Sequence, residues 1–273
     1  MNKSETVNRP RPPFQNEITV TALSSGIYNF SSPPVGFQQY LVIGDENALL
    51  IDTGIGVGSL KETVEKITHL PVIVINTHCH PDHAGGNAEF APAYINPAEL
   101  DVYHKMATLE FRKDDISHMP MGKTLAESLQ PTGPEPVAIE DGAVINLGGR
   151  EVSVLYTPGH THGSLSVYDQ QSGSLFVGDN ISAREVAMTE WNADTVEHYR
   201  ESLIKMKALN PTRVCTGHKP NILPPESIDS LLDAAEAVLS GADPFESPSR
   251  NGDIFLKYPR QSPNLCFRTD NIR

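Results

Sequence analysis

This chain of 273 residues has few of the features that mark membrane-spanning, disulfide-stabilised or nucleic-acid-binding proteins. No apolar run reaches the roughly 20 residues that a membrane helix requires, so we expect no contact with a membrane. The three cysteines are unevenly spaced, which excludes a disulfide framework and favours the cytoplasm as the compartment. Acidic residues outnumber basic ones and give a formal net charge of −13, which argues against a nucleic-acid partner.

Aromatic residues are also scarce, at 7% with a single tryptophan, and the hydrophobic fraction is 38%. Residues 1–16 are polar and rich in proline, without the apolar stretch of a signal peptide, so we expect an N-terminal arm there. The remainder, residues 17–273, is long enough to bury a sizeable core, and we predict that it forms one domain. Nothing in the sequence indicates an oligomeric state.

What the chain does contain is a dense cluster of imidazole and carboxylate side chains after a predicted strand. The β-branched run over residues 72–75 is typical of a buried strand. It is followed by His78, His80, Asp82 and His83 within six residues. Imidazole and carboxylate together suit borderline divalent metals, above all zinc. We therefore predict a metal site on the loop that leaves this strand.

Three further candidate ligands occur later in the chain, each preceded by a glycine and each at the end of a predicted strand. They are His160, Asp179 and His218. A glycine at such a turn lets the backbone pass close to a bound ion. Any one of these three signals alone is weak. Together with the cluster that follows residues 72–75, they make four signals in order at strand ends, which indicates that they belong to the same metal site.

Hydrophobic periodicity places these candidates among strands and helices. Strands are predicted over residues 18–24, 39–43, 48–52, 72–75, 93–95, 143–147, 151–156, 164–169, 174–177 and 213–216. Helices are predicted over residues 59–67, 195–209 and 226–239. In chain order, the predicted strands are interrupted by one helix and are followed by further strands and helices. This order favours two sheets covered by helices.

These motifs resemble the metallo-β-lactamase superfamily over about residues 17–240. The resemblance is carried by His78-x-His80-x-Asp82-His83 and by the three later ligands, together with the run 48–54 and the turn 157–161. It implies the α/β class and an αββα sandwich of two mixed sheets flanked by helices, with the metals at one edge.

The resemblance also implies a binuclear centre. The implied ligands are His78, His80 and His160 on the first metal, Asp82, His83 and His218 on the second, and Asp179 bridging the two. Two zinc ions are expected, although iron or manganese suit the same donors. Asp82 and Asp179 are also the predicted catalytic residues, because their charges leave a net positive centre even after a hydroxide is added.

The implied reaction is hydrolysis of a small-molecule substrate by a hydroxide that bridges the two metals. Asp179 excludes the β-lactamases that have a cysteine at this point, and the tail after Gly241 lacks the basic helical region typical of glyoxalase II. We therefore expect a lactone or another carboxylic ester as the substrate, with a thioester as the first alternative. A β-lactam, a phosphodiester and a non-catalytic metal-binding scaffold are the remaining alternatives.

Residues around the motif support narrower hypotheses. Asp52 is expected to accept hydrogen bonds from the metal loop or from a ligand imidazole, with a simple turn residue as the alternative. Cys79 is expected to point away from the metals, since neighbours on an extended segment alternate. Segment 103–136 lacks clean periodicity. It is expected either to lie over the metals and shape the substrate pocket, or to form a helical hairpin that only covers a sheet.

Overall fold

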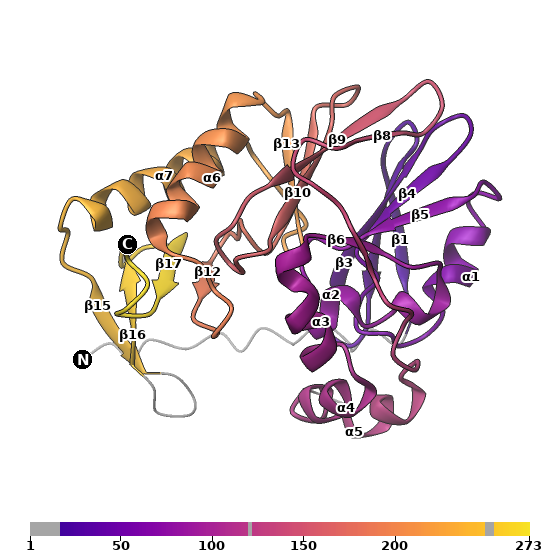
Figure 1. The fold of residues 1–273 in the computed structure, drawn as a ribbon, viewed down its shortest axis with the longest axis horizontal. Coiled ribbons are helices and arrows are strands. Elements are labelled where there is room, and N and C mark those ends of the chain that lie inside the picture. Colours follow the sequence, from indigo (N-terminus) through magenta and orange to yellow (C-terminus); the bar gives the residue numbers. More distant parts are fainter. Residues whose placement is uncertain (1–16, 120–121, 249–253) are drawn as a thin grey trace, which may run out of the picture.

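The computed structural model describes residues 17–119, 122–248 and 254–273 (Figure 1). The predicted arm over residues 1–16 lies outside the described residues. Within the described part, the strands form a seven-stranded, a six-stranded and a four-stranded sheet. None of the described helices combines the length and the apolar character needed to span a bilayer.

The first sheet is mixed, with antiparallel pairs at one side and parallel pairs at the other. Its strands, in spatial order, are β1 (Thr19–Ser24), β2 (Ile27–Ser32), β3 (Phe37–Ile43), β4 (Ala48–Ile51), β5 (Val72–Ile75), β6 (Tyr94–Ile95) and β7 (Val137–Ala138). Strands β1 to β4 pair antiparallel, whereas β4 to β7 run parallel. Strand β5 is a central strand, and the predicted metal loop follows it directly.

The second sheet is also mixed. Its strands, in spatial order, are β14 (Ile222–Leu223), β13 (Arg213–Thr216), β11 (Ser174–Gly178), β10 (Leu165–Asp169), β9 (Glu151–Tyr156) and β8 (Val144–Asn146). Strand β10 is antiparallel to both β9 and β11, and β11 is parallel to β13. Strands β9, β11 and β13 therefore run in the same direction, and their carboxyl ends lie at one edge of the sheet.

Alternation along the strands divides the apolar side chains between a central and an outer layer. Val42 and Ile51 pack with Phe176 of the second sheet in a buried cluster between the two sheets. Leu50, one residue before Ile51, faces the other way and packs on Leu60 of helix α1 (Leu60–Glu65). Burial of such side chains stabilises the sandwich by about 25 cal/mol per Å² of apolar surface.

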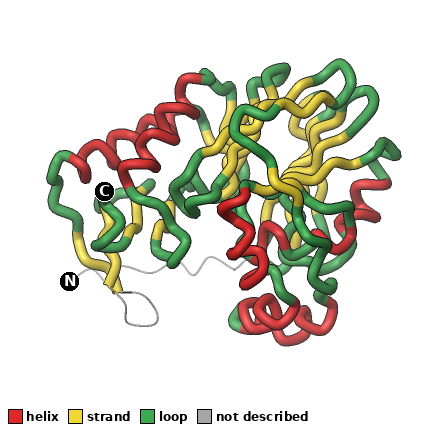
Figure 2. The backbone as a smooth tube through the Cα atoms, in the orientation of Figure 1, coloured by secondary structure: helices red, strands yellow, loops and turns green. Residues whose placement is uncertain are grey.

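Helices α6 (Val196–Ala208) and α7 (Glu226–Leu239) lie side by side on the outer face of the second sheet (Figures 1 and 2). Leu203 and Leu231 pack there against Leu175 of β11. Thr195 caps α6, because its side chain accepts a hydrogen bond from the backbone N–H of His198. The layers are therefore helix, sheet, sheet and helix, which confirms the predicted αββα sandwich.

The third sheet lies beside these two helices and is built mainly from the C-terminal segment (Figure 1). Its strands, in spatial order, are β12 (Glu185–Met188), β17 (Asn264–Phe267), β16 (Ile254–Tyr258) and β15 (Phe245–Pro248). The sequence carried no sign that β12 would pair with β17. This pairing holds β12 next to the predicted metal site.

Short helices connect the two halves of the sandwich. They are α2 (Pro81–Ala84), α3 (Leu100–Met106), α4 (Leu109–Ser117) and α5 (Gly122–Leu125), with 3-10 turns η1 (Asn87–Glu89), η2 (Pro97–Glu99) and η3 (Ala126–Ser128). Val102 of α3 packs with Cys79 and Ala84 of the metal loop, and α4 packs on α2. The described part of segment 103–136 therefore lies against the metal loop.

Candidate metal centre

All the predicted ligands meet at the edge where β5, β9, β11 and β13 end. The structure brings them together in three overlapping groups, and within each group the donor atoms lie within 4.8 Å of one another. The groups are His78, His80 and His160, then His78, His83 and Asp179, and then Asp82, His83 and His218. These groups are typical of a binuclear metal site. Which of the two ions each residue would bind stays a prediction.

Unpartnered buried atoms point into this cluster. Nε2 of His78, Nε2 of His83 and Oδ1 of Asp179 are buried and have no hydrogen-bond partner in the described part of the chain. Such atoms cost free energy unless they bind something. A divalent cation satisfies imidazole nitrogen and carboxylate oxygen together, so the residues present fit a pair of metal ions.

The half of the cluster that contains Asp82 is strongly polarised. Nε2 of His218 lies 3.0 Å from Oδ2 of Asp179 and 3.3 Å from Oδ2 of Asp82. Burial alone lowers the pKa of His218, but the charge and hydrogen bond of Asp179 and the charge of Asp82 together outweigh it and raise that pKa to about 9. Burial likewise opposes protonation of His83, and the neighbouring carboxylates still raise its pKa well above the usual value. This half therefore attracts positive charge.

The other half of the cluster favours neutral imidazoles. Burial, followed by the positive charge of neighbouring histidines, holds the pKa of His78 and of His80 well below the usual value. Metal ions bind imidazole only through a nitrogen that carries no proton. His78 and His80 are therefore in the protonation state that coordination requires.

Asp52 holds the metal loop in place and has the contacts predicted for it. Its carboxylate accepts hydrogen bonds from N and Oγ1 of Thr77, at 2.7 and 2.8 Å, and from Nδ1 of His83 at 2.8 Å. The last bond turns Nε2 of His83 toward the cluster. Asp52 has a φ of 61°, a strained value for a residue other than glycine, and these contacts keep it there.

Two of the glycines beside the ligands are required by close approach. A Cβ on Gly217 would lie 2.4 Å from Oδ1 of Asp179 and 2.5 Å from Cε1 of His83. Gly178 has a φ of 53°, and a Cβ there would lie 2.4 Å from Oγ1 of Thr77. The backbone thus passes against the ligands themselves, as the sequence pattern indicated.

Sequence reasoning missed the polar residues that connect the ligand loops. Glu99 is fully buried and accepts hydrogen bonds from the backbone N–H groups of Cys79, at 2.7 Å, and Gly163, at 3.1 Å. Oδ1 of Asn180 accepts a hydrogen bond from the N–H of His160 at 2.9 Å. The only signal for Asn180 was its place next to Asp179, and Glu99 had none.

Burial shows which way Cys79 and His198 face. Cys79 is fully buried against α3 and points away from the ligand cluster, as predicted. The side chain of His198 is 57% exposed and lies 2.7 Å from Oδ1 of Asp194. His198 therefore faces solvent rather than the ligand cluster.

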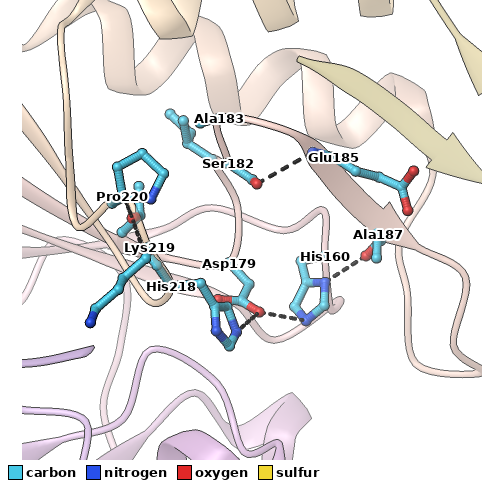
Figure 3. Close-up of a pocket in the computed structure, with 11 residues that line it drawn as sticks. His160, Asp179, Ser182, Ala183, Glu185, Ala187, His218, Lys219 and Pro220 are labelled. Carbon is cyan, nitrogen blue, oxygen red and sulfur yellow. Dashed lines mark hydrogen bonds and ion pairs between the residues drawn. The ribbon is translucent and has the colours of Figure 1, made fainter. Parts of the chain in front are cut away.

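A pocket with an empty volume of about 370 Å³ opens beside the cluster (Figure 3). Its lining consists of His160, Asp179, Ile181, Ser182, Ala183, Glu185, Ala187, Thr216, His218, Lys219 and Pro220. Figure 3 shows His160, Asp179 and His218 turned toward one another at one side of it. No described residue of segment 103–136 lines this pocket, so the effect of that segment on substrate choice stays a prediction.

Comparison with known proteins supports the same fold and site. A sequence model of the metallo-beta-lactamase superfamily matches residues 35–218. The chain is 31% identical over 159 residues to the acyl-coenzyme A thioesterase MBLAC2 of Homo sapiens, covering 52% of this chain and 57% of that protein. It is 33% identical over 112 residues to a hydroxyacylglutathione hydrolase of Synechococcus sp. (strain JA-3-3Ab), covering 41% and 35%. The chain thus spans about half the length, or less, of these two relatives.

Solved structures agree on the fold. A metallo-beta-lactamase family protein from Thermus thermophilus gives a TM-score of 0.61 at 21% identity, over 80% of this chain and 82% of that one. A metallo-beta-lactamase from Pontibacter korlensis gives 0.61 at 19% identity, over 81% and 99%. Since the family pattern covers more than half of the chain and includes every clustered ligand, the chain belongs to the metallo-beta-lactamase superfamily.

Proposed function

We propose that this protein is a metal-dependent hydrolase that cleaves thioesters, with acyl thioesters of coenzyme A as the first substrate class. The observation that carries the proposal is a complete ligand cluster in a chain that is 31% identical to an acyl-coenzyme A thioesterase. The sequence favoured a lactone or another carboxylic ester. The relatives support the thioester alternative instead, because hydroxyacylglutathione is also a thioester.

The chain would contribute ligands, their orientation and a shaped pocket to this reaction. When bound, a pair of divalent ions lowers the pKa of a shared water and adds positive charge where an oxyanion develops. The clustered histidines and aspartates would hold the ions, while Asp52 and Glu99 fix the loops that present them.

The leaving group of a thioester suits this site. It is a thiolate, and a free thiol has a pKa of about 8.5, so it departs at neutral pH with little help from a proton donor. Five histidines of the site belong to the clustered groups and would be committed as ligands. A reaction that needs no dedicated general acid is therefore compatible with the residues present.

Lys219 gives the pocket a feature that fits a charged thioester. Lys219 lines the pocket next to His218. Its Nζ passes close to the backbone of Gly36, where a Cβ would lie only 3.0 Å from it. Its ammonium forms no hydrogen bond or ion pair with another residue in the described ranges. Coenzyme A and glutathione are both anionic, and an unpaired ammonium can bind a carboxylate or phosphate group.

A substrate panel on protein reconstituted to equal metal content tests the proposal. Turnover is compared for an acyl-coenzyme A, the same acyl group on glutathione, a lactone, a phosphodiester and a β-lactam. We expect kcat/KM for a thioester to exceed that for the lactone by at least about tenfold, or ~1.4 kcal/mol. A lactone preference would contradict the proposal, and full metal content without any turnover would favour the scaffold alternative.

A further inference from the structure

Three of the five candidate ligand histidines share a pattern in the ring nitrogen that points away from the cluster. The contacts of that nitrogen are His83 Nδ1 to Asp52 Oδ2 at 2.8 Å, His78 Nδ1 to Thr77 Oγ1 at 3.2 Å and His160 Nδ1 to Ala187 O at 2.5 Å. In each case the nitrogen reaches an oxygen that can accept its proton. Such a bond fixes both the tautomer and the orientation of a metal-binding imidazole.

His80 breaks this pattern. Its Nδ1 faces the cluster, 3.0 Å from Nε2 of His160, and its Nε2 points away and lies 3.3 Å from Nδ2 of Asn192. A neutral imidazole that coordinates through Nδ1 carries its proton on Nε2, which then needs an acceptor. The amide nitrogen of Asn192 is a donor and cannot accept that proton.

The acceptor that His80 needs belongs to the same amide. Asn192 is fully buried, and its Oδ1 has no hydrogen-bond partner among the described residues. A half-turn of the amide exchanges oxygen and nitrogen within the same space. That one rotation satisfies the orphaned oxygen and supplies the missing acceptor.

We infer that Asn192 is a positioning residue of the metal centre. Its Oδ1 accepts the proton of Nε2 of His80 and thereby keeps Nδ1 of that ring unprotonated and aimed at the ions. The inference rests on the metal-dependent function proposed above. It extends that function to a residue outside the ligand motif and 112 positions away from His80 in the chain.

The backbone around Asn192 is built to hold it there. The carbonyl oxygen of Asn192 accepts a hydrogen bond from the N–H of His162 at 2.7 Å, and the N–H of Asp194 donates to the carbonyl oxygen of Gly159 at 2.9 Å. Nδ2 of Asn271, near the C-terminus, donates to the carbonyl oxygen of Asp194 at 2.9 Å. Asn192 thus lies between two ligand loops, bonded to one through its backbone and to the other through its side chain.

Metal affinity in two variants tests the role. Asn192→Leu keeps the size of the side chain and removes the acceptor, so we expect the affinity for the ion held by His78, His80 and His160 to fall about 10- to 100-fold. Asn192→Asp keeps an accepting oxygen and should bind both ions at least as tightly as the wild type. Stepwise competition between the protein and a chelator, with Zn²⁺ as the probe, measures the two affinities separately.

Asn264 provides the matched control. Its Oδ1 is also buried without a partner in the described ranges, but Asn264 lies on β17 and forms no hydrogen bond there with any of the clustered histidines, so Asn264→Leu should leave both Zn²⁺ affinities unchanged. If Asn192→Leu does not fold, Asn192→Ala removes the acceptor without adding bulk. Unchanged Zn²⁺ affinity in Asn192→Leu and Asn192→Ala, or an equal loss in Asn192→Asp, would overturn the inference.

A spectroscopic measurement separates positioning from simple packing. In ¹⁵N NMR of the Zn²⁺-loaded protein, His80 should show a protonated Nε2 whose hydrogen exchanges slowly with water, and Asn192→Leu should lose that slow exchange. Neither readout depends on turnover. A Zn²⁺-loaded protein with this signature and no thioesterase activity would contradict the proposed function and leave the role of Asn192 intact.

Discussion

Glu99 shows how one buried side chain can set the distance between two ligand loops. Each of its carboxylate oxygens accepts one backbone N–H, from Cys79 and from Gly163. Glu99→Gln places an NH₂ group against one of these donors, so we expect the unfolding free energy to fall by about 1–3 kcal/mol. Urea denaturation of metal-free protein measures it, with the exposed Glu127→Gln as the control. Equal stability of the two variants would show that Glu99 does not hold the loops.

Lys219 allows a test of the charge of the substrate. Lys219→Met removes the ammonium from the pocket, and we expect KM for an acyl-coenzyme A to rise about tenfold, or ~1.4 kcal/mol. The matched N-acetylcysteamine thioester has the same reacting group without a phosphate, so its KM should not change. Lys66→Met, on the surface beyond α1, is the control variant. An equal loss on both substrates would mean that Lys219 acts through its neighbour His218.

The clustering of the candidate ligands could be predicted from the sequence because their signal is local. His78 to His83 lie on one short segment, and each later ligand is marked by its own glycine. The supporting residues carry no such signal, because their partners are distant along the chain. Glu99 is 20 residues from Cys79 and 64 from Gly163. Only the folded chain brings such pairs together.

At the scale of elements, helix α4 depends on an unusual buried residue. Arg112 is fully buried and donates hydrogen bonds to the carbonyl oxygens of Ala107, Ile55 and Gln130, at 3.0, 3.0 and 2.8 Å. Arg112→Met leaves these oxygens without donors, and at about 1–3 kcal/mol each we expect a loss of at least ~3 kcal/mol in unfolding free energy. Thermal and urea denaturation measure it. The exposed Lys113→Met on the same helix should change it little.

The buried pair of Arg150 and Asp169 joins the start of β9 to the end of β10 in the second sheet and also contacts the first sheet. Nε and Nη2 of Arg150 bond to Asp169 at 3.0 and 2.5 Å, and Nη1 donates to the carbonyl oxygen of Ile43 in β3 at 3.1 Å. Asp169→Asn leaves a buried guanidinium unpaired, so we expect a loss of about 3–5 kcal/mol at pH 7. Urea denaturation of both proteins measures the difference.

The pH dependence of that difference has a fixed sign. Burial alone raises the pKa of Asp169, but the hydrogen bonds from Arg150 and Ser172 outweigh it and hold the pKa below the usual value. The stabilisation is therefore present above the unfolded pKa of about 3.9 and is lost as the pH falls through the lower folded pKa. A difference between wild type and Asp169→Asn that grows on acidification would contradict this account.

The same elements show why part of the fold could not be predicted. Along the strands of the sandwich, side chains alternate between the two faces or form continuous apolar runs. These patterns are visible in the sequence. Helix α4 buries Arg112 and Ile116, so a charged residue occupies a core position and hides the periodicity. Strand β12 was missed because its partner β17 comes much later in the chain and lies outside the sandwich.

For the whole molecule, the ligands come from both sheets of the sandwich. His78 to His83 follow β5 of the first sheet, whereas His160, Asp179 and His218 follow β9, β11 and β13 of the second. Ions bound among them would link the two sheets at one edge, and the contact of Arg150 with β3 links them as well. The substrate could not be read from this architecture, because it depends on side chains that line the pocket rather than on the fold.

Removal of the metal should therefore destabilise the whole molecule and not only stop turnover. A ligand that binds only the folded state adds about 2.7 kcal/mol at a free concentration 100 times its dissociation constant, so two ions would add up to ~5 kcal/mol. We expect a chelator to lower Tm, and Zn²⁺ to restore it. His218→Ala should lose part of this Zn²⁺-dependent gain, because the group of His78, His80 and His160 stays complete. The exposed His104→Ala should keep all of it, and a Tm that does not respond to Zn²⁺ would contradict a metal link between the sheets.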